Sequence, residues 1–366
     1  MDTLRFVIYD KAGNFQAQIE GAAEASAELV ANAVNTAEFT IPDDHRAVDA
    51  ITTPGARCAV HFRGVERFRG MIKETPGEGP DGWITAQVRC DIRKFWEWYG
   101  WQVPGNAIGS QTSAYRAYTG PAETVAKNAM AENFTRLGVP WSVTGSAGRG
   151  ATSRVQLRMH PLADKLFPIL DANDLIVVLA YDGPNVVVGM RGRETVPGVL
   201  TLASGVPEGY EFNRIAPTAT RVIVGGRGEG AAREFVQVID SARESDWGDI
   251  VESFMDARNT EEGSDITIDG AMALAEGAEK AALSTELNET ERFMFGTTYD
   301  VGDLVNVRMG PVEVTQPVSV SITESASNGV EVTPYIGDLD VSADTDIRMQ
   351  RMIAKLAKNL RDKGRG

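Results

Sequence analysis

The stretch Arg221-Val-Ile-Val-Gly-Gly-Arg-Gly-Glu-Gly-Ala-Ala-Arg-Glu234 decides between two fold classes. An apolar run that leads into a glycine-rich turn is typical of a dinucleotide-binding fold, in which a helix must follow the turn and hold the pyrophosphate. Here the turn leads into Glu234-Phe-Val-Gln-Val-Ile-Asp240, whose β-branched and aromatic residues predict a strand. No strand–helix–strand unit surrounds the motif. The stretch therefore predicts a hairpin with a glycine-rich loop over residues 225–230, and it favours a β-rich fold over a nucleotide site.

The length and composition of the chain indicate a folded protein of two or more domains. The chain has 366 residues, of which 43% are hydrophobic and 24% are charged; it is too long for one ordinary core and too apolar for a disordered segment. No apolar run approaches the roughly 18 residues that a membrane span needs, and the first residues lack the regions of a secretory signal. We expect a protein that folds in the cytoplasm of the cell that makes it, without stable membrane insertion.

The charge balance is acidic, with 51 Asp and Glu against 36 Lys and Arg and a formal net charge of -15. Such a surface repels phosphate backbones, so tight nucleic-acid binding is not expected without a strong basic patch. Only the C-terminal tail is basic in character. The same surface would suit a conduit through which DNA slides without sticking, and charge alone does not separate that role from plain solubility.

The two cysteines, Cys58 and Cys90, both lie on the apolar face of an alternating segment. Cys58 shares its face with Val60 and Phe62, and Cys90 shares its face with Val88 and other apolar residues. This phase predicts buried thiols, and it favours them over a redox or metal-binding pair.

Periodicity along the chain predicts an α+β fold that is mainly β. The predicted units are an N-terminal β domain over residues 1–95, an α+β insertion domain over residues 96–210, a second β domain with a helical insert over residues 211–340, and a basic amphipathic helix over residues 341–366.

Three helices inside these units are suggested by spacing and by the residues that flank them. The clearest runs over Pro121–Leu137, with apolar residues at steps of three and four, a proline at its start and Gly138 as its stop. A shorter helix is predicted over residues 161–170, disturbed by Pro168. The alanine-rich stretch Asp269–Leu283 also predicts a helix.

An aromatic cluster follows the first β domain, in the stretch Phe95-Trp-Glu-Trp-Tyr-Gly-Trp101. Stacked rings bind sugars or single-stranded bases in some proteins, and in others they close a core or a subunit contact. Base stacking normally comes with a positive groove, and no basic residue is interleaved after Lys94. We favour a core or interface role over a ligand site for Trp96, Trp98, Tyr99 and Trp101.

A second candidate contact site lies near the end of the chain, where Asp344–Arg361 predicts a helix with an apolar stripe. The stripe is too short for an independent coiled coil, so we expect a helix that docks on a partner or orders on assembly. The stripe consists of Met349, Ile353, Leu356 and Leu360.

No pattern in the sequence indicates catalysis. The three histidines, His45, His61 and His160, lie far from one another and form no metal-ligand pattern with the cysteines. The hydrolase, zincin and Walker motifs are absent from the sequence. We predict a protein that is not an enzyme and that has no cofactor and no metal.

The order of several short motifs resembles the hub, or minor tail, proteins of siphoviruses that infect actinobacteria. The resemblance extends from about residue 30 to residue 337. The motifs are Ala37–His45, Ile51–Phe62, Phe68–Ile72, Val222–Gly230, Trp247-Gly248, Phe254–Arg258, Tyr299–Val305 and Pro334–Gly337.

The resemblance implies a structural virion protein at the tail tip, assembled in the host cytoplasm. It implies a homotrimer in which two related antiparallel β-barrel domains per chain form a ring around the DNA-ejection channel. The implied partners are the distal tail protein, the tape-measure protein and tail-tip or receptor-binding proteins, with only transient contact with passing DNA. Asp300 and Asp303, from the Tyr-x-x-Gly-Asp pattern, become candidates to face a partner or the lumen. Two alternatives stay open, a tail-associated cell-wall hydrolase and a carbohydrate-binding tail protein that uses the aromatic cluster.

Overall fold

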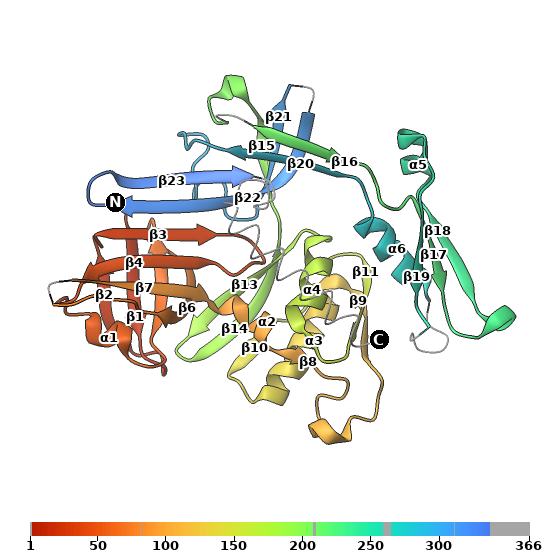
Figure 1. Cartoon of the computed structure of the whole chain (residues 1–366), viewed down its shortest axis with the longest axis horizontal. Helices are drawn as coiled ribbons and strands as arrows, with labels where there is room; N and C mark the ends of the chain where they lie inside the picture. The colour runs from red at the N-terminus through yellow and green to blue at the C-terminus, as the bar shows by residue number, and fades with distance from the viewer. Residues whose placement is uncertain (1, 81, 208–209, 259–264, 311, 337–366) are drawn as a thin grey trace.

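The structure, a computed structural model, describes residues 2–80, 82–207, 210–258, 265–310 and 312–336. It consists of one large sheet, an α/β unit and an arm that extends beyond the sheet (Figure 1). In the described ranges no helix is both long and apolar enough to cross a membrane. The stripe Met349, Ile353, Leu356 and Leu360 lies outside the described residues.

The large sheet contains strands from both ends of the chain, in the order β16-β20-β23-β22-β3-β4-β7-β6-β5-β1-β2, with β15 and β21 branching from β22. Near the N-terminus, β1 pairs with β2 and β5 pairs with β6, both antiparallel. The short helix α1 (Val48–Thr52) precedes β5. The strands are β1 (Leu4–Tyr9), β2 (Phe15–Glu20), β3 (Glu24–Leu29), β4 (Thr36–Pro42), β5 (Arg57–Phe62), β6 (Val65–Glu74), β7 (Trp83–Cys90), β15 (Thr195–Thr201), β16 (Glu211–Ile215), β20 (Lys280–Glu286), β21 (Leu304–Met309), β22 (Val312–Ser325) and β23 (Gly329–Ile336).

The pairing of β22 with β3 joins the two β-rich regions. It places Ile322 opposite Ala27, both buried, so the alternating apolar faces of the two strands merge into one core. Among the described strands the sheet stays open, with β16 and β2 at its ends. The mainly β fold is confirmed, whereas the two closed barrels are not seen. To close into two barrels, each β-rich region would have to pair its own edge strands, but β22 and β3 pair with each other and join the two regions.

The α/β unit packs against this sheet and shares its core. The predicted helix is confirmed as α3: Pro121 precedes its first turn and Gly138 ends it with a positive φ of 64°. The predicted shorter helix is α4, which contains Pro168. The elements of the unit are α2 (Lys94–Glu97), β8 (Tyr99–Gly100), β9 (Arg116–Pro121), α3 (Ala122–Leu137), β10 (Trp141–Val143), β11 (Thr152–Leu157), β12 (His160–Pro161), α4 (Leu162–Asp171), β13 (Leu175–Asp182) and β14 (Asn185–Gly192).

Asn32 fastens the α/β unit to the sheet. Its side chain donates to Asp171 Oδ1 and to the Leu175 carbonyl, both at 2.7 Å, and accepts from the Val177 amide at 2.9 Å. Its backbone has a φ of 54°, a conformation that Asn tolerates better than most residues. One buried amide therefore satisfies groups from two segments far apart in the sequence.

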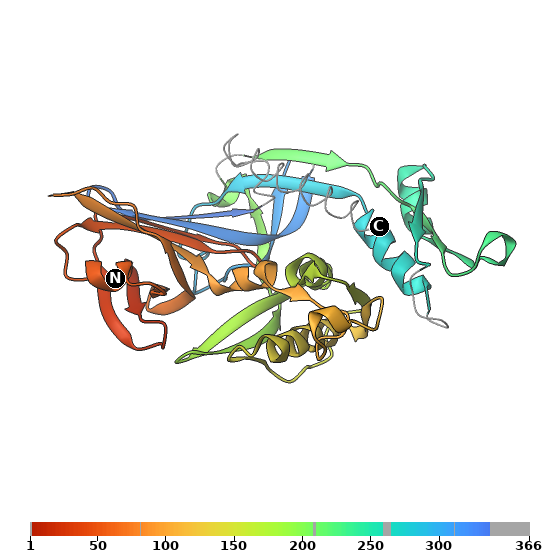
Figure 2. The same ribbon diagram turned by 60° about the horizontal axis from the view of Figure 1, so that its bottom comes forward.

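The arm lies beyond the ends of β16 and β20 and stands clear of the large sheet in two views (Figures 1 and 2). Its strands form a separate sheet in the order β18-β17-β19, with α6 packed on one face. Its elements are β17 (Arg221–Gly225), β18 (Phe235–Ile239), α5 (Ser241–Trp247), β19 (Glu252–Asp256) and α6 (Thr267–Glu276).

The glycine-rich stretch is a hairpin, as predicted, because β17 and β18 pair antiparallel from Arg221–Ile239 to Gly225–Phe235. Within the loop, Gly228 has a φ of 99°, and a Cβ there would lie 2.3 Å from the Ala232 carbonyl oxygen. The helix predicted over Asp269–Leu283 is correct only to Glu276. Residues 280–286 instead form β20, which pairs with β16 over residues 280–284 and with β23 over residues 285–286, since backbone pairing outweighs the helix propensity of alanine.

Both cysteines are buried and free, as their strand phase predicts. Burial raises the pKa of the Cys90 thiol to about 12 and raises the pKa of Cys58 further. Neither thiol is therefore ionised near neutral pH, which agrees with inert core residues.

Candidate functional site

The most extensive functional candidate is the solvent-facing side of the large sheet where the two β-rich regions join. Because side chains alternate along a strand, the apolar residues of β3, β4 and β22 face the core and their polar partners face solvent. We call this surface the acidic sheet face. Its residues are Glu24, Ser26, Glu28, Glu38, Thr40, Ser321, Thr323, Ser325 and Glu331.

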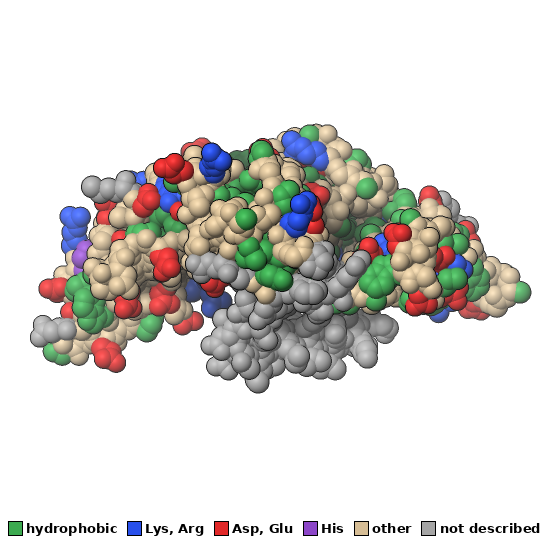
Figure 3. All heavy atoms as spheres, turned by 90° about the horizontal axis from the view of Figure 1, so that it is seen from above, with side chains coloured by type: hydrophobic (Ala, Val, Ile, Leu, Met, Phe, Trp, Pro, Cys, Tyr) green, Lys and Arg blue, Asp and Glu red, His purple; other side chains and the backbone are tan. Residues whose placement is uncertain are grey.

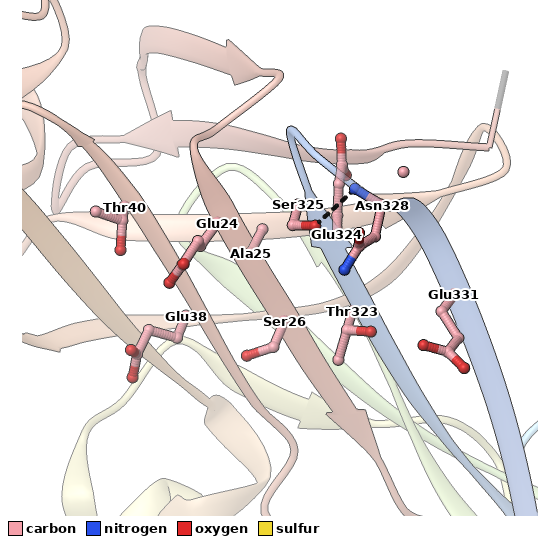
Figure 4. A pocket seen from close by; sticks show the side chains of 11 residues that line it. Glu24, Ala25, Ser26, Glu38, Thr40, Thr323, Glu324, Ser325, Asn328 and Glu331 are labelled. Carbon is pink, nitrogen blue, oxygen red and sulfur yellow. Dashed lines mark hydrogen bonds between the residues drawn. The ribbon is translucent and has the colours of Figure 1, made fainter.

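The register of the strands spreads the carboxylates over this face. Every glutamate lies opposite a hydroxyl or amide residue and never opposite another carboxylate, an arrangement that avoids like-charge pairs in direct contact. Figure 4 shows Glu24, Glu38 and Glu331 on neighbouring strands around Ser26 and Thr323. The opposed pairs are Glu24–Thr40, Glu24–Ser325, Glu38–Ser26, Glu38–Gln87, Glu28–Thr36, Glu28–Ser321 and Glu331–Thr323.

The charges of the acidic sheet face are directed to solvent. Within the described ranges Glu24, Glu38 and Glu331 have no ion-pair partner, and no group of three or more possible metal ligands occurs there. Burial raises the pKa of Glu28, and hydrogen bonds from Ser321 and Tyr335 oppose that shift. The arrangement can present a distributed negative potential, and it offers no compact centre for catalysis or metal binding.

The rest of the molecule carries charge differently. In the view of Figure 3, acidic side chains are interspersed with fewer basic ones, and no large basic patch is seen on this face. Many arginines are held in ion pairs, for example Arg63 with Glu289 and Arg221 with Glu244. Within the described ranges, Glu24, Glu38 and Glu331 of the acidic sheet face have no such ion pair.

Asp300 and Asp303 lie in the loop before β21 and have different surroundings. Asp303 is buried: its Oδ1 accepts from Arg191 Nη1 at 2.8 Å, and its Oδ2 accepts from the Asp300 amide at 2.8 Å. Asp300 is exposed and lies 3.4 Å from Arg67 Nη1. The carboxylate of Asp303 is thus used within the chain, and Asp300 is the member of the pair that reaches solvent.

A cluster missed by sequence reasoning holds this loop against β6. Arg63 makes two short hydrogen bonds to the carboxylate of Glu289 and one to the Phe295 carbonyl. The Arg67 guanidinium lies 4.1 Å from the centre of the Phe295 ring. These residues are more than 200 positions apart, so no local pattern in the sequence could have indicated the contact.

The aromatic cluster divides between the core and the surface. Trp98 lies edge-on to Trp141 at 4.9 Å and to Phe134 at 5.7 Å, and Trp96 lies 4.9 Å from Phe167. Tyr99 begins β8, and its carbonyl accepts from Arg136. Trp101 leaves the cluster and lines a surface cleft.

A second candidate contact surface is the side of the arm sheet that faces away from α6. Phe235 and Phe254 are each 56% exposed there, and Ile239 is also exposed. The Arg233 guanidinium lies between the two rings, 5.4 Å and 5.6 Å from their centres. Large apolar side chains exposed together on one sheet face are typical of interaction sites.

Comparison with known proteins gives the family. The model of the Siphovirus ReqiPepy6 Gp37-like protein family matches residues 5–201 and 208–338, which is most of the chain. The chain belongs to this family. A search of curated proteins found no match.

Three solved structures with a similar fold are tail proteins, two of them from prophages. The 43 kDa tail protein of prophage MuSo2 from Shewanella oneidensis has a TM-score of 0.55 at 13% identity, covering 93% of this chain and 99% of that one. Prophage tail protein gp18 from Listeria monocytogenes has a TM-score of 0.54 at 12% identity, covering 98% and 100%. A tail protein from Neisseria meningitidis has a TM-score of 0.52 at 12% identity, covering 92% and 97%.

At these identities the comparison shows a shared fold. Family and fold together confirm the coarser part of the resemblance: a siphovirus protein with the architecture of phage tail proteins, in agreement with a structural role in a tail. The hub assignment, the trimer and the actinobacterial host stay predictions.

Proposed function

We propose that this Gp37-like protein is the hub of a siphovirus tail tip. In this proposal three copies form a ring that joins the hexameric tail tube and distal tail protein to threefold tip components. The end of the tape-measure protein meets the ring, and DNA passes through it. The protein acts by position and shape, and it performs no chemistry.

The acidic sheet face carries the proposal. It spans strands from both ends of the chain, so it is formed only when the two β-rich regions join. Its unpaired carboxylates would repel the phosphates of passing DNA, because like charges raise the free energy of close approach. A channel wall of this kind lets DNA slide without binding, so we assign the acidic sheet face to the lumen.

Self-association is supported by the arm. Its sheet has exposed edges at β18 and β19 and an outer face with Phe235, Ile239 and Phe254. Burial of apolar surface contributes about 25 cal/mol per Å², so covering this face would favour assembly. We assign it to a contact with a neighbouring copy, and we assign exposed Asp300 to a contact with another tail protein.

The oligomeric part of the proposal is tested by mass photometry and negative-stain imaging of the purified protein, alone and with its distal tail protein. Threefold rings with a central opening are expected, and Phe254→Glu should shift them toward monomers. Monomers under both conditions would contradict the trimeric hub.

The channel part is tested by charge reversal. The triple variant Glu24→Lys, Glu38→Lys, Glu331→Lys should slow DNA ejection and make the purified protein retain duplex DNA at low salt. The control, Glu20→Lys, Glu229→Lys, Glu276→Lys, makes the same charge change at exposed sites elsewhere and should leave both unchanged. Equal DNA ejection and equal DNA retention by the two triple variants would contradict the assignment of the acidic sheet face to the channel wall.

The absence of enzymatic activity is also part of the proposal. Catalytic carboxylates or nucleophiles normally lie in a cleft with strongly shifted pKa values, and the acidic sheet face is open and spread out. Incubation of the purified protein with host peptidoglycan should release no soluble fragments. Release of fragments would instead support the cell-wall hydrolase alternative.

A further inference from the structure

The surface cleft lined by Trp101 lies on the α/β unit, between helix α3 and the segment from Trp101 to Ala117. Its volume is about 900 Å³, within the range of pockets that hold small organic ligands. The segment that forms its outer wall is the orange loop at the lower right of Figure 1, away from the large sheet. Nothing in the proposed hub function accounts for this cleft.

Hydrogen bonds within the loop hold the outer wall of the cleft in place. The side chain of Gln111 accepts from the Val103 amide at 2.8 Å, and its amide nitrogen faces the carbonyls of Val103, Asn106 and Ala107 at 3.1–3.4 Å. Asn106 adds a hydrogen bond to the Ser110 carbonyl. These bonds fix the loop before any ligand arrives, which lowers the entropy cost of binding.

Aromatic and charged side chains share the lining. Trp101 and Tyr115 are half-buried, and the Arg136 guanidinium lies 4.4 Å from the Trp101 ring. Glu132 is held in place by the Tyr118 hydroxyl at 2.7 Å and by a two-point contact with Arg116. Flat rings beside fixed polar groups are suited to a ligand that has both an apolar face and hydroxyl groups.

One polar atom of the lining is left without a partner. Gln102 Oε1 is buried and has no hydrogen bond in the described part of the chain. A buried acceptor without a donor costs about 1–3 kcal/mol, and in native proteins a water molecule or a bound group usually supplies the donor. The hydroxyl of a ligand in the cleft could take the place of such a water.

We propose that this cleft binds an oligosaccharide. The C–H face of a pyranose ring would pack on Trp101 or Tyr115, and ring hydroxyls would donate to Gln102 Oε1 and to the carboxylate of Glu132. A nucleic acid fits less well, because Arg116 is already paired with Glu132 and Arg136 already donates to Asn133 and Tyr99. Trp98 packs on the core and Trp96, although 37% exposed, packs against Phe167 outside the cleft, so Trp101 is the tryptophan of the cluster that lines it.

The test is binding to a printed array of bacterial oligosaccharides, with chitotetraose and maltotetraose as solution probes in calorimetry. Wild-type protein should bind at least one class of glycan. Trp101→Ala and Tyr115→Ala should each weaken that binding at least tenfold. The control Trp83→Ala removes a tryptophan that is 52% exposed outside the cleft and should bind as wild type.

Two results would overturn the proposal: no binding to the array or to either probe, or binding that both cleft variants retain at wild-type affinity. Thermal melting of each variant shows whether it is folded, and Gln102→Ala supplies a milder variant should Trp101→Ala unfold. Because the ring and channel experiments do not involve this cleft, the hub proposal and the glycan proposal stand or fall separately.

Discussion

The large sheet and the arm sheet are both built from alternating strands, yet they differ in what covers them. The large sheet packs into a core shared with the α/β unit, in which Phe6, Phe39 and Phe62 are almost fully buried. The arm has a separate small core, and the far side of its sheet leaves Phe235 and Phe254 exposed. Both sheets thus leave part of their surface open, but the open face of the large sheet is polar whereas that of the arm sheet is apolar.

This difference indicates which region stabilises the folded chain and which region is available for contacts with other molecules. Buried apolar area scales with the size of the core, so we expect the large sheet to fold without partners. The arm buries less apolar area in its own small core, and it retains an apolar face that a neighbouring molecule can cover. We expect the global unfolding transition to report on the large sheet, and local opening to report on the arm.

The largest effect should come from Phe39→Ala in the large sheet. The Phe39 ring is fully buried and lies 4.3 Å from the ring of Phe6. Its removal leaves a cavity and should lower the free energy of unfolding by about 3–5 kcal/mol. Denaturant unfolding followed by circular dichroism and tryptophan fluorescence should move to lower midpoint by both probes. A change confined to one probe would contradict a single shared core.

Arg154→Ala should separate the arm from the α/β unit. The Arg154 guanidinium is buried, donates to Asp269 on α6 at 2.7 Å and donates to the Asp265 carbonyl at 3.0 Å. Without it the Asp269 carboxylate is left without a cation at a partly buried site, and we expect a loss of about 3 kcal/mol. Hydrogen exchange should accelerate in α6 and β17 and stay unchanged in β5.

A double variant tests the cause of that loss. Arg154→Met with Asp269→Leu removes both charges, so much of the protection of α6 should return. If the α6 amides exchange as fast in the double variant as in Arg154→Ala, the contact stabilises the arm through packing and not through charge.

Leu274→Ala should affect the arm alone. Leu274 belongs to the small core between α6 and the arm sheet, and a partly collapsible site at the edge of a small core should lose about 2 kcal/mol. Exchange of β17 and β18 amides should rise while the global midpoint stays near the wild-type value. The matched variant Leu29→Ala, in the core of the large sheet, should instead lower the global midpoint.

The smallest effect concerns pH and the arm. Hydrogen bonds from Arg221 lower the pKa of Glu244 below its ordinary value of 4.5. A carboxyl with a lowered folded-state pKa supports folding above its unfolded pKa, and that support is lost as the pH falls through the folded value. Protection of the β17 amides should therefore decline slightly below about pH 4.5. Glu244→Gln should show no such decline, and equal slopes in both proteins would exclude this pair as the cause.

Local features were predictable because their causes are local. The hairpin at Arg221–Glu234 follows from what succeeds the glycine-rich turn, and helix α3 follows from apolar spacing and from Pro121 and Gly138. The end of the alanine-rich helix was not predictable, because the last residues of the predicted helix instead form a strand that pairs with β16. The roles of Asp303 and Glu289 were likewise hidden, because their arginine partners are more than 100 positions away.

By itself the sequence determined the strands, the faces they bury, the buried thiols and the acidic balance, since alternation and composition act on neighbouring residues and on totals. Only the tertiary structure decided that β3 and β22 pair, about 300 positions apart, and so where the glutamates of both ends gather. It also decided that Trp98 enters the core while Trp101 faces a cleft. Side-chain period identifies which face of a strand is polar, but only strand pairing determines which polar residues share a surface.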